Sequence, residues 1–435
     1  MRPTSSHPGL ETIHLMRFFF ITLVIAGHRN MQYWMGPLIN TNYMEKWYEY
    51  RWSMQLLGGP IIVDGLFAIG GLLLSYSLLT ELDAKKKMNF FGIMFARFLR
   101  LTPAYMMVVF FCALILPHMG SGPLWEWKIG MERDYCANNW WTNLLFVNNF
   151  VNLDRICLFP SWYLAIDYQL FAMALIVIYL FWRMPRKYGY AFLCAIIIGG
   201  CIILFVNTYV YGAPPLYILS LSMEDVRACP QYLMHYCKTQ QRIASYFIGV
   251  LVGAVLYDNG RHPWHLGKIL SNILFFLLVV MFSIGSQYLG YNYFDPNAKP
   301  TLLESAFYAA LSKAAFAIAT CAVPLLMTVG TGLTFHYNIL NPRWCQPLAR
   351  LTYGAFLVHF VIQLYDVGVT RASRTFTFHN GIWDCVQNVV FTYIVSLILT
   401  LIVEGPFRRL EKRFIMKSLT RVKSNGVKKQ AKKTN

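Results

Sequence analysis

Ten long apolar stretches limit what this chain can fold into. Each runs for about 16 to 24 residues, close to the roughly 20 that an α-helix needs to cross a bilayer. Long apolar runs, rather than short segments of alternating polarity, favour helices over a membrane barrel. The predicted spans are residues 15–34, 58–79, 101–118, 162–182, 190–211, 242–257, 269–289, 306–329, 349–367 and 386–403.

Composition supports the same interpretation. The 435 residues are 57% hydrophobic and only 13% charged, which is too few charges to cover a water-facing surface. We therefore predict an all-α, polytopic membrane bundle of about ten helices. Lys and Arg gather in alternate loops, such as the one holding Lys85, Lys86 and Lys87, so both termini are expected in the cytoplasm.

The net charge of +18 lies largely in the last residues of the chain. We predict a cytoplasmic N-terminal segment over residues 1–14, a transmembrane domain over 15–407 and a basic cytoplasmic tail over 408–435. A basic segment beside a membrane span favours membrane lipids as partners. We do not expect nucleic acid to bind.

Cysteine positions suggest two disulfides in an oxidising compartment. Cys136 and Cys157 fall in one predicted outer loop, and Cys229 and Cys237 fall in another. The sequence contains neither a Cys-x-x-Cys pair nor a His-x-x-x-His cluster, so we do not expect a metal site.

Ionisable residues inside the spans are few. An intramembrane charge is costly, so each needs a partner, a cavity or a function. The set comprises His28, Asp64, Asp167 and His359, with Arg17, Arg97, Arg100, Arg350 and Glu404 at the predicted span ends.

Arg17 and His28 are predicted to share one helix face, because eleven residues make almost three helical turns. The same rise places His28 roughly 16 Å deeper than Arg17. His359 lies nine residues after Arg350 and reaches a similar depth, so both histidines can face one cavity. The alternative is a core histidine that is hydrogen-bonded to a neighbouring helix.

Arginine and histidine suggest different chemistry at the two depths. Arginine clusters bind phosphate, and a histidine beside a buried carboxylate can hold the proton of an attacking hydroxyl or amine. We expect Asp167 nearer the outer side of its span. Gly70 and Gly71 follow Asp64 and indicate close helix packing.

Six stretches of the sequence, in this order, resemble the acyltransferase-3 family of membrane acyltransferases, and more closely its animal nose-resistant-to-fluoxetine branch. They are IHLMRFFFITLVIAGH, VDGLFAIGGLLLSY, ARFLRLTPAY, SWYLAIDYQLF, LARLTYGAFLVH and EGPFRRLEK.

The resemblance implies transfer of an acyl group from cytoplasmic acyl-CoA to an acceptor at the lumenal or extracellular side. The acceptor is left open as a lipid, a sugar or a small molecule, and the membrane as the plasma membrane or an endomembrane. The resemblance implies that His28 is the leading catalytic residue, and we add Asp167 and His359 as catalytic candidates. Arg17, Arg97, Arg100 and Arg350 are the candidates for binding the donor.

The sequence also departs from the family pattern. Gly70, Gly71 and Leu72 stand where a Ser-Gly pair and a Phe are usual, and Arg29 replaces a small hydroxyl residue and is expected to alter the cavity. Animal members typically carry an extracellular domain and an extra span before this region, so a short form or a fragment is expected. A transporter of lipids or small hydrophobic molecules and a catalytically inactive member remain alternative interpretations.

Overall fold

The computed structural model describes residues 8–409 except 35, 55–57, 218–224, 230, 231 and 296. Within this part of the chain, ten helices are long and apolar enough to cross a membrane, which confirms the predicted all-α bundle and its number of spans. The remaining β-structure there is two isolated bridges. Almost all of the predicted basic tail, from residue 410 onward, and the first seven residues lie outside the described residues.

The spanning helices follow one another along the chain and are joined by loops and short helices. Their bounds are α2 (Ile13–Trp34), α5 (Ile62–Lys85), α6 (Phe90–Leu114), α8 (Trp162–Arg183), α9 (Arg186–Tyr209), α10 (Ile243–Arg261), α11 (Lys268–Leu274) continued through η11 (Phe275–Met281) into α12 (Phe282–Tyr288), α13 (Leu302–Val329), α15 (Cys345–Gly368), and α16 (Phe378–Leu399) continued by η13 (Thr400–Glu404). The shorter helices are α1 (Pro8–Glu11), α3 (Thr41–Glu45), α7 (Met131–Leu144) and α14 (Thr334–Leu340).

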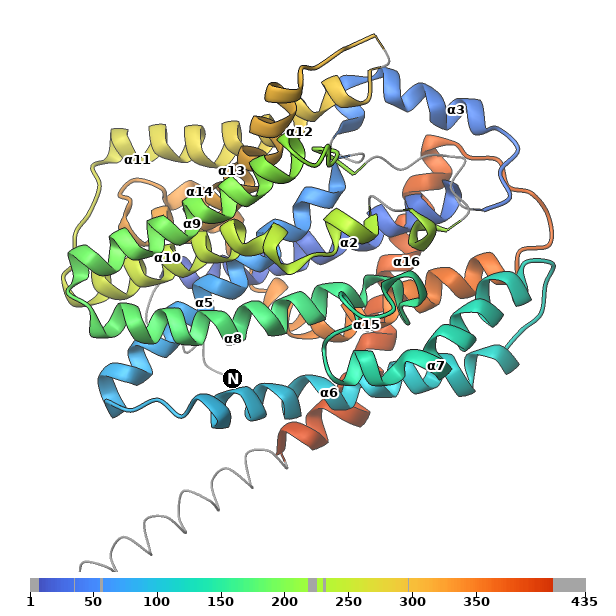
Figure 1. Cartoon of the computed structure of the whole chain (residues 1–435), viewed down its shortest axis with the longest axis horizontal. Helices are drawn as coiled ribbons and strands as arrows, with labels where there is room; N and C mark the ends of the chain where they lie inside the picture. Colours follow the sequence, from blue (N-terminus) through green and yellow to red (C-terminus); the bar gives the residue numbers. More distant parts are fainter. Residues whose placement is uncertain are drawn as a thin grey trace, which may run out of the picture.

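The connections differ in length between the two ends of the bundle. The loops that follow α5, α8 and α10 are short, whereas those that follow α2, α6 and α9 are long and carry α3 and α7. Because successive spans alternate in direction, these three long connections gather at one end, on the right in Figure 1. We call this the long-loop end.

Helices α5, α10 and α13 form the centre of the bundle and pack against one another. Helix α2 lies against α5, α15 and α16, while α8 and α9 complete the wall on the other side. The segment from α11 to α12 is largely uncovered and presents Ile269, Phe276 and Leu277 to its surroundings. An apolar surface of this kind is suited to lipid contact.

The third spanning helix starts earlier than predicted. It begins at Phe90 rather than at residue 101, because the prediction counted Arg97 and Arg100 with the preceding basic loop. Arg97 and Arg100 therefore lie inside α6. Arg97 is seven residues from the start of the helix, which corresponds to roughly 10 Å of rise.

One of the two predicted disulfides is present. Cys136 and Cys157 are bonded, with their Cα atoms 4.5 Å apart. The predicted pairing of Cys229 with Cys237 is wrong, because these two cysteines are not joined by a disulfide. Each lies beside a tyrosine hydroxyl instead, Cys237 beside Tyr232 and Cys229 beside Tyr217.

Glycines bring α5 and α10 into backbone contact. A Cβ added at Gly71 would lie 2.2 Å from the carbonyl oxygen of Tyr246, and one at Gly249 would lie 1.9 Å from that of Ala68. This confirms the predicted packing role for Gly71. Gly70 faces elsewhere. A Cβ added there would lie 3.6 Å from the Oδ1 atom of Asp167, its nearest neighbour.

Replacing Gly249 with Ala should force α5 and α10 apart and lower the free energy of unfolding by roughly 1–3 kcal/mol, the usual effect of overpacking. The measurement is the thermal unfolding midpoint of the purified protein. The matched control is Gly199→Ala on α9, where an added Cβ meets nothing within 4 Å. Equal midpoints for the two variants would contradict the proposed contact.

Candidate active site

Two histidines from different helices meet inside the bundle. His28 lies on α2 and His359 on α15, and their Nδ1 and Nε2 atoms are 2.8 Å apart. The Gln363 amide donates a hydrogen bond to the carbonyl of Ile25 at 2.9 Å and so ties the two helices together beside the pair. The two histidines are therefore adjacent, but the expectation that both face one cavity is met by His28 alone, because His359 does not line it.

Hydrogen bonding assigns a proton to each neutral ring. The Nδ1 atom of His359 lies 2.7 Å from the carbonyl oxygen of Phe356, which can only accept, so this Nδ1 carries hydrogen. Nε2 of His359 then accepts from Nδ1–H of His28. The result is a bare lone pair on Nε2 of His28. His359 itself is fully buried behind His28.

His28 opens into a small cavity of about 100 Å³, the histidine cavity. Aromatic and aliphatic side chains make its wall, and the ring of Phe159 stands edge-on to His28 with centroids 5.9 Å apart. No carboxylate is among the residues that line it, in the part of the chain that the structure describes. The side chain that accepts a hydrogen bond from His28 is therefore His359, and Asp167 does not line this cavity.

A larger cavity of about 610 Å³ lies between α2, α5, α6, α8 and α15. We call it the arginine cavity, because its lining includes Arg17, Arg97, Arg100 and Arg408. Its volume falls within the roughly 300–1,000 Å³ that is typical of small-molecule sites.

The arginines that line the arginine cavity differ in their ionic partners. Arg97 forms an ion pair with Asp167 and stacks over the ring of Phe171. Arg408 pairs with the buried Glu404 at 2.9 Å. Arg17, in contrast, makes neither a hydrogen bond nor an ion pair with any described residue. Its guanidinium is thus available to an anion.

Three sequence expectations need correction. Asp167 lies in the arginine cavity, because α6 extends far enough inward to bring Arg97 to its level. Arg350 is exposed and does not line the cavity; it lies near His14 at the start of α2. Arg408 was assigned to the tail, although its spacing of four residues from Glu404 gave a signal for an ion pair on a continuing helix.

The two cavities share part of their lining. Leu66, Tyr163 and Phe356 border both the arginine cavity and the histidine cavity. We call these three side chains the dividing wall. They separate the unpaired Arg17 from His28, two groups that stand on the same face of α2 about 16 Å apart by helical rise.

A cluster of buried polar groups, which we call the cap, joins α7 to the segment that carries Phe159 of the histidine cavity. Glu132 on α7 is completely buried and pairs with Arg227 at 2.7 Å. Burial alone lowers the pKa of Arg227, but Glu132 and Asp225 outweigh it and raise that pKa above its ordinary value. Glu132 also accepts a hydrogen bond from the backbone N–H of Leu158 at 2.6 Å, which fixes the approach to Phe159.

The disulfide between Cys136 and Cys157 joins the same cap. It links α7 to Cys157, the residue before Leu158. The backbone of Leu158 has a φ of 57°, which is uncommon for a residue other than glycine. Because both sulfurs are bonded to each other, the cluster that they form with Glu132 offers no thiolate to a metal ion.

Two further intramembrane charges, Asp64 and Arg29, are paired outside these cavities. Asp64 is buried between Arg242 and the Ser245 hydroxyl, at 2.5 and 2.7 Å. Arg29 is also buried, and it bonds to Asp366 at 2.6 Å and to Asp384 at 3.0 Å. The expectation that Arg29 alters the cavity is therefore wrong, because two carboxylates hold its guanidinium elsewhere.

The fold and these cavities define a multi-pass integral membrane protein with a histidine site inside its helical bundle. Residues 10–407 match the family described as acyltransferase domain, and the chain belongs to this family. Nose resistant to fluoxetine protein 6 of Caenorhabditis elegans is 25% identical over 426 residues, covering 92% of this chain and 51% of that protein. The chain thus spans about half the length of this relative. No solved structure matches this chain.

Replacing Glu132 with Ala should destabilise the cap, because the buried Arg227 would keep only the more distant Asp225, at 3.4 Å, as a counter-charge. Breaking such a pair costs about 3–5 kcal/mol, which should lower the thermal unfolding midpoint. Glu126→Ala is the control, since Glu126 is 77% exposed in its pair with Arg133 and such pairs contribute little. A Glu132 variant as stable as this control would show that the cap does not depend on the ion pair.

Proposed function

We propose that the protein is a membrane acyltransferase in which acyl-CoA binds in the arginine cavity and His28 acts as general base. The observation that carries the proposal is the adjacency of the two cavities across the dividing wall. One cavity offers cations for phosphates, and the other offers a basic nitrogen. Membership of the acyltransferase family supports the reaction class.

Donor binding rests on the charge of the arginine cavity. Four guanidinium groups line it, against the two carboxylates of Asp167 and Glu81, which are paired with Arg97 and Lys85. Guanidinium groups bind phosphate oxygens through forked, charge-assisted hydrogen bonds. The phosphates of a CoA thioester would bind there, and its narrow acyl-bearing arm would point toward the dividing wall.

The reaction requires the thioester to pass Tyr163 and Phe356. At His28, Nε2 takes the proton of an acceptor hydroxyl, and the oxygen attacks the thioester carbonyl carbon. The carbon–oxygen bond forms, the carbon–sulfur bond breaks, and the protonated His28 returns its proton to the CoA thiolate. His359 is a positioning residue, because it holds the ring of His28 and does not touch the substrate.

Transport of a lipid or small hydrophobic molecule is the second candidate, since neighbouring cavities also suit a permeation path. The donor separates the two functions: an acyltransferase cleaves a thioester, whereas a transporter leaves it intact. An inactive member would bind acyl-CoA without cleaving it.

Replacing His28 with Ala should lower thioester cleavage by about 10²- to 10⁴-fold, the usual contribution of a general base. The measurement uses purified protein with labelled acetyl-CoA and longer acyl-CoAs, and it scores both hydrolysis and transfer. Turnover equal to that of the wild type would reject the catalytic assignment.

The positioning role of His359 has a separate readout. His359→Leu should lower kcat while the KM for acyl-CoA stays near its wild-type value. His359→Asn, which keeps an acceptor for Nδ1–H of His28, should recover part of the loss. An equal loss of kcat in both variants would indicate a structural role only.

Replacing Arg17 with Gln should weaken acyl-CoA binding roughly 10- to 100-fold, since a hydrogen bond to a charged group contributes about 1.5–3 kcal/mol. Arg17 is preferable to Arg97, whose removal would leave Asp167 unpaired. The matched control is Arg350→Gln, because Arg350 does not line the cavity. Equal affinities of the two variants at physiological salt would refute this donor site.

A further inference from the structure

An intramembrane lysine faces a third cavity. Lys313 lies eleven residues after the start of α13, roughly 16 Å along the helix. It forms neither an ion pair nor a hydrogen bond within the described part of the chain. Lysine inside a membrane span is costly, so such a residue marks a functional site by default.

The cations around Lys313 outnumber the anions. Arg242 and Asp64 are its charged neighbours, and they already neutralise each other in their ion pair. The charge of Lys313 is therefore uncompensated. His235 adds no second cation, because burial and then the Lys313 ammonium lower the pKa of its imidazole below the ordinary value.

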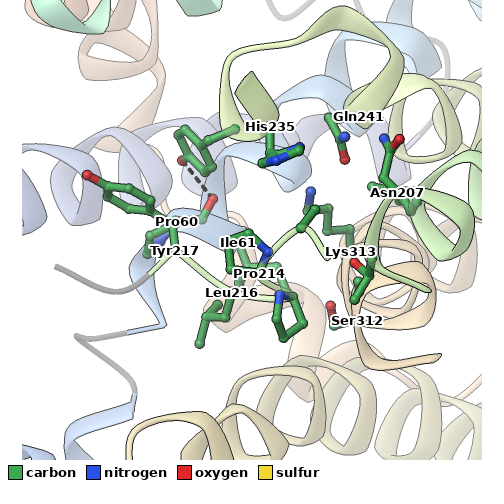
Figure 2. A pocket seen from close by; sticks show the side chains of 16 residues that line it. Pro60, Ile61, Asn207, Pro214, Leu216, Tyr217, His235, Gln241, Ser312 and Lys313 are labelled. Atoms are coloured by element: carbon green, nitrogen blue, oxygen red, sulfur yellow. Dashed lines mark hydrogen bonds between the residues drawn. The ribbon is translucent and has the colours of Figure 1, made fainter. Parts of the chain in front are cut away.

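Polar donors surround this ammonium group. Figure 2 shows Lys313, His235, Gln241 and Asn207 reaching into the same cavity from different segments. None of these four side chains makes a hydrogen bond with another described residue. The cavity has a volume of about 50 Å³, which suffices for a few water molecules or for one carboxylate or phosphate group. We call it the lysine cavity.

The lysine cavity adjoins the histidine cavity on one side. Pro60, Tyr217 and Tyr236 line both. On the other side, Ser312 is shared with a groove of about 790 Å³ between α12 and α13. Exposed apolar side chains line this groove, among them Phe282, Leu289, Leu303, Phe307 and Leu311. A polar cavity thus lies between His28 and a surface suited to hydrocarbon.

We propose that the lysine cavity binds the anionic group of an amphiphilic acceptor whose hydrocarbon chain lies in the groove between α12 and α13. The anionic group is a carboxylate or a phosphate, recognised by the Lys313 ammonium and the neighbouring amides. This inference rests on the proposed function and specifies its acceptor. The hydroxyl or amine that receives the acyl group would lie past Tyr217 and Tyr236, next to His28.

Three probes with one identical oleyl chain test the site by equilibrium binding to the purified protein. They are oleate, oleoyl lysophosphatidic acid and the uncharged oleyl alcohol. Lys313→Gln should weaken binding of at least one anionic probe about 10-fold or more and leave oleyl alcohol unchanged. Lys313→Arg should retain binding. Lys187→Gln, an exposed lysine at the start of α9, is the control for the change of charge.

Each outcome decides a part of the proposal. The anionic probe that depends on Lys313 identifies the class of headgroup. Anion affinities within twofold of the wild type in Lys313→Gln, or an equal loss for oleyl alcohol, would overturn the site. Binding of inorganic phosphate as tight as that of oleoyl lysophosphatidic acid would overturn the role of the groove.

A second measurement uses only the wild-type protein, in case Lys313→Gln does not fold. A photoactivatable analogue of the bound probe should crosslink to peptides of α12 and α13, and crosslinks confined to other helices would contradict the proposal. Probe binding requires no chemistry, so it can succeed even if His28→Ala shows unchanged turnover. The failure of the acceptor site and the failure of the proposed function are therefore distinguishable.

Discussion

A charge inside a bilayer needs a counter-charge, and most of this structure depends on meeting that requirement. Asp64 with Arg242 joins α5 to α10, Arg97 with Asp167 joins α6 to α8, and Glu404 with Arg408 closes the end of the last span. Two cations that line cavities in the described part of the chain break this pattern. Arg17 and Lys313 have no ionic partner, and each lines a cavity. The unpaired charges thus mark where a ligand would complete the electrostatics.

The fold follows from sequence patterns that act locally. Apolar length alone identified ten spans, because each helix must satisfy its own backbone hydrogen bonds in lipid. Helix ends were less predictable. The start of α6 carries Arg97 and Arg100 and was therefore counted with the basic loop, although Asn89 caps the helix by accepting a hydrogen bond from the backbone N–H of Gly92. Disulfide pairing was predictable for Cys136 with Cys157 but not for Cys229, since proximity in sequence does not orient thiols.

The candidate site was predictable where one helix carries the information. The eleven-residue spacing on α2 placed Arg17 and His28 correctly on one face. The partner of a side chain depends on the register between helices, which no single segment encodes, so Asp167 was expected beside the histidines and instead meets Arg97. Lys313 is a different case. It lies within the predicted span 306–329, and the cost of an intramembrane charge was a sufficient signal to identify it.

The dividing wall has a consequence for the membrane as an electrical insulator. The arginine and histidine cavities hollow the bundle on either side of Leu66, Tyr163 and Phe356. Without these side chains the two cavities would merge, and hydrated ions could pass from one to the other. Three bulky side chains preserve the seal, because an ion must shed its hydration to pass between them. An uncharged acyl chain meets no such penalty, so the same barrier discriminates between a leak and a group transfer.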